Sequence, residues 1–213
     1  ITNEMIEQGV IYEKGEANYV GKKLTRGRKK ILIDINPNYK FVFGVTVDSG
    51  FVSIGLTNIA GETLEKTLLE LDDELSVEEM FLKVVKNIEL IKQNNCLTDD
   101  VILGLGVCIS NEHYATLKIK TNGFVPNFTS VKASLEKMVS FPVVVSDTVS
   151  AMAQAEIDFN MDGAKPDNIM FIRFGNNIEA SVLIDNKPYR GFNNCAVNIA
   201  HTSIKTQGIK CPE

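Results

Sequence analysis

The sequence has no apolar run close to the roughly 20 residues that a membrane-spanning helix needs. Its first residues, ITNEMIEQG, lack the basic and then apolar pattern of a secretion signal. We therefore expect a cytoplasmic protein. Cysteine is also scarce: the four residues Cys96, Cys108, Cys195 and Cys211 lie far apart, which argues against a disulfide framework.

The chain nevertheless has enough apolar residues to fold. Hydrophobic residues make up 44% of the 213 residues and charged residues 23%, and this composition is too apolar for a disordered chain. A chain of this length can bury a sizeable core, in one large or two small domains.

Basic residues are concentrated near the N-terminus, although the net charge is −5. Residues 14–30 contain seven lysines and arginines and a single acid, Glu16. An acidic protein with one basic segment is typical of a polyanion contact confined to that segment, because phosphate binding requires clustered cations. The alternative is a solvated linker without a binding role.

The residues around the basic segment favour DNA binding. MIEQG indicates a helix end capped by Gly9, VIYE indicates a short strand, and ILIDIN at 31–36 indicates its partner strand. Helix, strand, basic loop and strand form the back half of a winged helix-turn-helix, whose wing lies along the phosphate backbone. The recognition helix is missing from this pattern. The residues expected to contact DNA are Lys22, Lys23, Arg26 and Arg28.

From residue 39 the hydrophobic pattern is that of an α/β domain. Three strand-like runs separated by short turns predict an antiparallel meander. A helix then begins at Ser76, where Ser76 and Glu79 form a capping box, and near-continuous apolar runs of the buried-strand type follow. The predicted elements are strands at 39–48, 51–59, 62–71, 101–109 and 141–147, helices at 130–139 and 150–159, and a second hairpin with strands at 168–175 and 179–189.

The spacing of apolar residues predicts which face of two helices is buried. After Ser76, one face carries Val77, Met80, Phe81, Val84, Val85, Ile88 and Ile91. The helix at 150–159 is expected to pack through Met152, Ala155 and Phe159.

The order of the elements indicates a known architecture. Three antiparallel strands followed by helix, strand, helix and strand is the order of one lobe of the actin-like, ribonuclease H-like fold. We divide the chain into a remnant of a winged-helix domain with its linker at 1–36, a first actin-like lobe at 37–160, and the start of an incomplete second lobe at 161–213. Two lobes of about 100–150 residues each and a winged helix need more than this length, so we expect part of a longer protein.

The sequence resembles the ROK family of sugar-responsive repressors and sugar kinases along nearly its whole length. GRKKILIDINPNYKFVFGVTVDSGFVSIGLTNIAGE is similar to the junction of DNA-binding and sugar-binding domains in the repressor branch. The segments GLGVCIS, FVPNF, FPVVVSDTVSAMAQAE and RGFNNCAVNIAHTSIKTQGIKC follow in the family's order and spacing. The resemblance implies a bacterial, DNA-binding homodimer, similar to the xylose and N-acetylglucosamine repressors, whose actin-like part binds a carbohydrate.

The phosphate loops of the family's kinases are not retained. A kinase has Asp-x-Gly-Gly-Thr where this chain has Thr46-Val47-Asp48-Ser49-Gly50, and Gly-x-Gly-Ile-Gly where it has Gly175-Asn176-Asn177-Ile178-Glu179. Glycines in such loops let backbone N–H groups approach the nucleotide, so these replacements put Cβ atoms and a carboxylate where the triphosphate would lie. The comparison predicts a protein that is not an enzyme; the alternative is an active, glucokinase-like sugar kinase.

The sugar-binding positions are retained only in part. Asp147 matches the family's Asp, which in kinases deprotonates the attacking hydroxyl and in repressors accepts a hydrogen bond from the sugar. Asn198 replaces a sugar-binding Glu, so affinity or specificity should change. The alternative role of Asp147 is to cap the helix that starts at Thr148. The expected effector-binding residues are Ser110, Asn111, Asn127, Ser146, Asp147, Asn198 and His201.

His201 and Cys211 match the first two zinc ligands of the family. Glu213 stands at the next ligand position, where the family has Cys. A structural zinc site needs four donors, so the resemblance suggests zinc as a cofactor while the ligand set in this sequence is incomplete. A His–Cys pair at this spacing can also be coincidence.

These features together predict a ROK-type, sugar-responsive transcriptional regulator: a DNA-binding repressor with a degenerate kinase site. Its partners would be DNA, a small-molecule carbohydrate and a second copy of the chain, without membrane contact. Effector binding would move the wings of the dimer and change operator affinity. Besides the kinase, the remaining alternative is a structural or protein-interaction derivative that binds no sugar.

Overall fold

The structure is a computed structural model. It describes residues 1–16, 30–48, 50–71, 76–110, 121–122, 125–126, 128–159, 167–175, 178–191, 196–197, 199–200, 202, 205 and 208. Within these ranges, no helix is long and apolar enough to cross a membrane.

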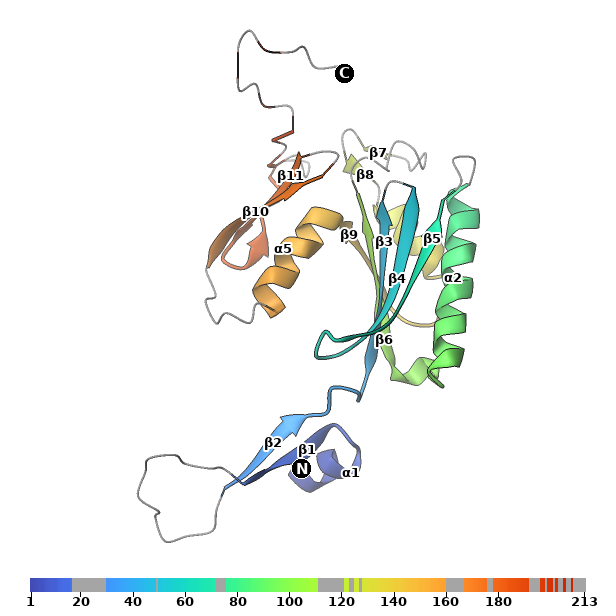
Figure 1. Ribbon diagram of the computed structural model, residues 1–213, viewed down its shortest axis with the longest axis vertical. Coiled ribbons are helices and arrows are strands. Elements are labelled where there is room, and N and C mark those ends of the chain that lie inside the picture. Colours follow the sequence, from blue (N-terminus) through green and yellow to red (C-terminus); the bar gives the residue numbers. More distant parts are fainter. Residues whose placement is uncertain are drawn as a thin grey trace.

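The centre of the molecule is a mixed five-stranded sheet with the strand order β5-β4-β3-β6-β9 (Figure 1). β3 (Phe41–Asp48), β4 (Phe51–Asn58) and β5 (Thr63–Glu70) form the predicted antiparallel meander. β6 (Ile102–Ile109) and β9 (Val143–Asp147) run parallel to β3. The carboxyl ends of β3, β6 and β9 therefore meet at one edge of the sheet.

Two helices, α2 (Val77–Asn94) and α4 (Phe128–Leu135), pack on one face of this sheet. Alternate residues of each strand point to that face, since side chains in a strand alternate between the two sides. The predicted capping box is confirmed: the Glu79 N–H donates to the Ser76 hydroxyl, and the Ser76 N–H donates to the Glu79 carboxylate at 3.0 Å. The fully buried core side chains include Phe43, Ile54, Met80, Ile88, Leu105 and Leu135.

A smaller antiparallel sheet lies beyond α5 (Thr148–Phe159). It consists of β10 (Asn168–Phe174), β11 (Ile178–Ile184) and β12 (Lys187–Pro188), so the second predicted hairpin is confirmed. α5 packs against this sheet through a small apolar cluster. The cluster contains Ala153, Ile157 and Leu183, with Ile169 and Phe171 packed against it.

The predicted packing face of α5 is wrong. Met152 and Phe159 are 43% and 57% exposed, whereas Val149, Ala153 and Ile157 are buried. α5 begins directly after the last residue of β9, and this connection fixes how the helix is rotated about its axis. The buried residues Val149, Ala153 and Ile157 are four positions apart and therefore lie on one face of the helix. The helix carries apolar residues on several sides, so periodicity alone could not identify the face that would be covered.

The N-terminal elements lie at the opposite end of the molecule from β10 and β11 (Figure 1). α1 (Thr2–Glu7) is followed by β1 (Ile11–Glu16) and β2 (Ile31–Ile35), which pair antiparallel as the sequence predicts. Gly9, with φ +72°, ends α1 as predicted: its N–H donates to Ile6, and the N–H of Val10 donates to Met5.

The segment between β2 and β3 is hydrogen-bonded to both of its neighbours. The Asn36 side chain donates to the carbonyl of Gly9 at 2.9 Å, at the base of the hairpin. The N–H of Ile59, in the turn between β4 and β5, donates to the carbonyl of Pro37 at 3.1 Å. The hairpin is therefore joined to the sheet by an ordered connection over residues 36–40.

Three short elements complete the described part. A 3₁₀ helix, η1 (Asp99–Val101), leads from α2 into β6. β7 (Thr121–Asn122) and β8 (Val125–Pro126) form a two-residue antiparallel ladder before α4.

Candidate functional site

Polar residues gather where the parallel strands of the large sheet end. Asp48 is the last residue of β3, Ser110 follows β6, and Ser146 and Asp147 end β9. Cys108 pairs with Ser146 and Ile109 with Asp147 in the parallel ladder, so these chain ends are adjacent. The carboxyl edge of a parallel sheet is the usual place for ligands in α/β folds. The structure thus brings together Ser110, Ser146 and Asp147, three of the residues that the sequence analysis names as effector-binding candidates.

Asp147 caps α5. One of its carboxylate oxygens, Oδ1, accepts the backbone N–H of Ser150 at 2.8 Å. This is the geometry of an N-cap, and the cap predicted as an alternative role is therefore present. A carboxylate has about four acceptor positions, so capping alone leaves acceptor capacity for a ligand hydroxyl. The cap also fixes the direction in which Asp147 points.

Two buried hydroxyl groups lie beside Asp147. Ser110 and Thr148 are only 2% and 6% exposed, and no described residue hydrogen-bonds to either side-chain oxygen. Ser110 is held through its backbone, whose N–H donates to Val47 at 3.1 Å. A buried hydroxyl without a partner is destabilising, and such groups occur where a ligand or an ordered water completes the hydrogen bonding.

Cys108 lies next to this group but is not a reactive thiol. Burial, together with the charge of the nearby Asp147 carboxylate, raises the pKa of Cys108 to about 11. The thiol is therefore protonated at neutral pH, whereas a nucleophilic cysteine needs a lowered pKa. Within the described residues, Cys96 and Cys108 are both free thiols.

An ion-pair cluster at the same edge joins the two sheets. Arg173 of β10 donates to Asp48 at 2.7 Å and to Glu179 of β11 at 3.2 Å. The hydrogen bond and charge of Asp48 raise the pKa of Arg173 above its ordinary value, against the opposing effect of burial. In the resemblance to ROK kinases, Asp48 and Glu179 stand at positions where the phosphate loops have glycines. The structure links these two positions through Arg173.

Arg173 was not among the residues predicted from the sequence. The signal was present, because NIMFIRF alternates along β10 and places Arg173 on the same side as Ile169 and Phe171, which pack near α5. An arginine on the inward face of a strand requires a partner. Its partner Asp48 lies 125 residues away in sequence and could not be identified from the local pattern.

Several predicted site residues lie outside the described part of the chain. These are the effector candidates Asn111, Asn127, Asn198 and His201, the DNA candidates Lys22, Lys23, Arg26 and Arg28, and the metal candidate Cys211 together with His201. The structure leaves these predictions untested. Among the residues it does describe, no three His, Cys, Asp or Glu side chains lie close enough to hold a metal ion.

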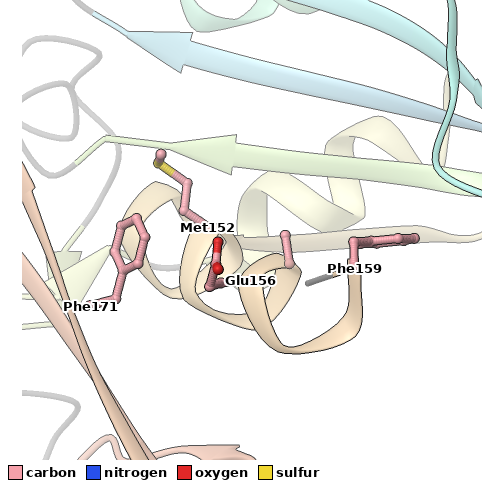
Figure 2. A pocket seen from close by; sticks show the side chains of 5 residues that line it. Met152, Glu156, Phe159 and Phe171 are labelled. Carbon is pink, nitrogen blue, oxygen red and sulfur yellow. The ribbon is translucent and has the colours of Figure 1, made fainter. Parts of the chain in front are cut away.

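A shallow apolar depression of about 280 Å³ lies along α5. Figure 2 shows Met152, Glu156 and Phe159 on the helix, with Phe171 of β10 near Met152. The depression lies beyond the first turn of α5 and does not include Asp147. It is therefore separate from the predicted effector site.

Comparison with curated proteins relates the chain to proteins named xylose repressor. It is 24% identical over 218 residues to the xylose repressor of Caldicellulosiruptor bescii, covering 99% of this chain and 52% of that protein. The xylose repressor of Bacillus subtilis is 22% identical over 218 residues, with 98% of this chain and 53% of that protein covered. The chain thus spans about half the length of these curated relatives.

Solved structures share the fold. A ROK family transcriptional regulator, a homolog of the E. coli MLC protein, matches with a TM-score of 0.70 and 21% identity over 99% of this chain and 52% of that chain. The ROK hexokinase from Thermus thermophilus matches with a TM-score of 0.60 and 14% identity over 81% of this chain and 55% of that chain. At these identities the matches establish only the fold, which is the α/β fold of ROK proteins and sugar kinases. Residues 44–212, most of the sequence, match the ROK family, and the chain therefore belongs to the ROK family.

Proposed function

We propose that this chain is the sensor and linker part of a sugar-responsive transcriptional repressor whose kinase site is degenerate. One observation carries the proposal. Asp147, which matches the sugar-binding Asp of ROK proteins, lies at the same sheet edge as the Arg173–Asp48 ion pair, and Asp48 stands where the kinases have a phosphate-loop glycine. The relatives named xylose repressor, and the related structure named as a transcriptional regulator, also support it.

The effector in this proposal is a small carbohydrate bound at the carboxyl edge of β6 and β9. Asp147 supplies a charged acceptor, and the hydroxyls of Ser110 and Ser146 can donate or accept hydrogen bonds. The buried hydroxyls of Ser110 and Thr148 support a polar ligand, because its hydroxyl groups could satisfy them. Asn111, Asn127, Asn198 and His201 complete the set proposed from the sequence.

Phosphoryl transfer is not part of the proposal. A kinase must hold a triphosphate with backbone N–H groups and cations, because its catalysis is mainly positioning and charge stabilisation. Here the corresponding positions carry the carboxylates of Asp48 and Glu179, which repel phosphate. The Arg173 guanidinium pairs with both of these carboxylates.

The DNA-binding end of the proposed regulator is the remnant of a winged helix. α1 and the β1–β2 hairpin support it, because helix, strand and returning strand occur in the order of that motif. The basic segment with Lys22, Lys23, Arg26 and Arg28 connects the two strands in sequence. We propose that the regulator acts as a homodimer whose two wings contact one operator.

A carbohydrate screen by thermal denaturation tests the proposal. A sugar present at about 100 times its Kd should raise the Tm of the chain by roughly 5–10 °C. Asp147→Asn should abolish that increase, because Asn can still cap α5 but loses the charged acceptor. Asp158→Asn, at an exposed carboxylate of the same helix, is the control and should keep the increase.

Two results would overturn the proposal. If xylose, glucose, fructose and N-acetylated hexosamines all leave the Tm unchanged, the chain is a structural or interaction derivative. If a coupled assay detects ATP-dependent sugar phosphorylation that is lost in Asp147→Asn, the chain is a kinase.

A further inference from the structure

The sequence differs from the kinase pattern at both phosphate loops, and one side chain contacts a differing residue from each loop. Asp48 ends β3, and Glu179, the second residue of β11, lies 131 positions later in the numbering. The Arg173 guanidinium contacts both carboxylates, at 2.7 Å and 3.2 Å. Two substitutions that look unrelated in the sequence thus form one cluster in the structure.

The two ion pairs have different structural roles. Arg173 and Glu179 are directly opposite each other in the antiparallel ladder of β10 and β11, so their contact lies within the small sheet. Asp48 belongs to the large sheet. The Arg173–Asp48 contact therefore joins the two sheets, while Glu179 holds the guanidinium in position.

The cluster is shielded enough for its charges to matter. The side chains of Arg173, Asp48 and Glu179 are 28%, 15% and 10% exposed, so solvent screens them less than it screens a surface pair. The cluster contains two acids and one base. Without Arg173, two partly buried carboxylates would be left without this cation, which is far less favourable than the paired state.

Besides this ion pair, a small apolar cluster links the β10–β12 sheet to the rest of the molecule. The β10–β12 sheet is held against α5 by Ala153, Ile157 and Leu183, with Ile169 and Phe171 beside them. α5 in turn continues directly from β9, and β6 lies between β9 and β3. The Arg173–Asp48 contact at the end of β3 is thus about 10 Å from the covalent connection at β9, given the usual spacing of strands. Two connections separated in this way restrict rotation more than one does.

We propose that Arg173, bridging Asp48 and Glu179, is an internal clasp that fixes the β10–β12 sheet against the carboxyl edge of the large sheet, at the position of the kinase phosphate loops. The clasp replaces a nucleotide by a contact within the chain, so the arrangement of the two sheets does not depend on ATP. The inference goes beyond the proposed function, because it holds whether or not a sugar binds.

Charge-neutral variants test the clasp. Asp48→Asn should lower the Tm by about 3–8 °C and increase hydrogen exchange of the β10 and β11 amides by about tenfold. The control is Asp34→Asn, which removes an exposed ion pair with Lys14 at the same 2.7 Å distance and should change neither quantity.

The size of the Asp48→Asn effect in a second background makes the test specific. Arg173→Met should lower the Tm more than Asp48→Asn does, because it removes the cation that contacts both carboxylates. In the Arg173→Met background, Asp48→Asn should lower the Tm by much less than it does in the wild type, since the contact with Arg173 is already lost. This comparison separates the Arg173 contact from the other interactions of Asp48.

The possible results divide clearly. A destabilisation by Asp48→Asn that largely disappears in Arg173→Met, with faster exchange in β10 and β11, supports the clasp. If Asp48→Asn resembles Asp34→Asn, or has the same effect on the Tm in both backgrounds, or leaves exchange in β10 and β11 unchanged, Arg173 does not join the two sheets in this way.

Discussion

Lys92, near the end of α2, shows how a single buried charge is accommodated. Only 9% of its side chain is exposed, and its ammonium group contacts Glu89 at 2.9 Å and also Asp99. Burial opposes the charge, but the hydrogen bonds to Asp99 and Glu89 outweigh it and raise the pKa of Lys92. Hydrogen bonds from Lys92 and Ser140 lower the pKa of Asp99. The cluster joins α2 to η1 and to the segment before β9.

Replacing Asp99 with Asn should destabilise the fold by about 1 kcal/mol at neutral pH, because Lys92 loses a charged partner that is itself half-exposed. The folded-state pKa of Asp99 is below its unfolded value. Its contribution is therefore present above the unfolded pKa and is lost as pH falls through the folded pKa. Urea unfolding should show a difference between wild type and variant at about pH 7 that shrinks toward about pH 3.

Asp185→Asn is the matched control for this measurement, because Asp185 is exposed in the turn after β11 and Asn tolerates its positive φ. It should change stability little at either pH. A difference for Asp99→Asn that stays equally large in acid would mean that the Lys92–Asp99 charge interaction is not its cause.

The sequence predicts individual elements better than the contacts between them. The meander, the parallel strands and the capping box follow from alternation, apolar runs and the Ser76–Glu79 spacing, which are local signals. The face of α5 was predicted incorrectly because Met152, Ala153, Ile157 and Phe159 surround the helix. Asp147 could be predicted because it matches an Asp of the ROK family. The partner of Arg173 could not be predicted, because Asp48 lies on another sheet.

The turn between β4 and β5 holds the far end of α5. Gly61 in this turn has φ +83°, and a Cβ placed there would lie 2.8 Å from the Phe159 ring. Asn58 braces the turn by accepting the N–H groups of Ala60 and Glu62, at 3.1 and 3.0 Å. Glycine is therefore favoured at position 61 for two separate reasons, its conformation and the nearby ring.

Gly61→Ala should cost about 1 kcal/mol for the positive φ and a further amount for displacing Phe159. Gly50→Ala provides the comparison, because Gly50 has φ +75° and no atom within 4 Å of the added Cβ. The excess cost of Gly61→Ala should disappear in a Phe159→Ala background, measured by chemical unfolding. An excess that persists without the ring would show that α5 is not held by this contact.

At the scale of the whole molecule, β3 connects the two proposed functional ends. It begins after the hydrogen-bonded connection that follows the β1–β2 hairpin, and it ends at Asp48, which contacts Arg173 (Figure 1). Eight residues of strand span about 25 Å. The β4–β5 turn contacts the same connection through Ile59 and Pro37, and it contacts α5 through Gly61. In the proposed regulator, these contacts form a continuous route from the effector edge to the hairpin.

The proposed DNA contact at the far end predicts a particular dependence on salt. Basic side chains that neutralise phosphates release counterions, and each contact adds about 0.9 to the slope of log affinity against log salt concentration. Such contacts position a protein on DNA without reading the base sequence of the DNA. Replacing Lys22, Lys23, Arg26 and Arg28 with alanine should therefore weaken binding to operator and non-operator duplexes alike and reduce the slope by about three to four. Fluorescence anisotropy across a salt series measures both effects.

Replacing the exposed lysines Lys66, Lys86, Lys137 and Lys187 is the control with equal charge and should leave the slope nearly unchanged. If the basic-segment variant keeps the full slope and weakens only one operator, the segment reads bases, and its assignment as a wing along the phosphate backbone is wrong.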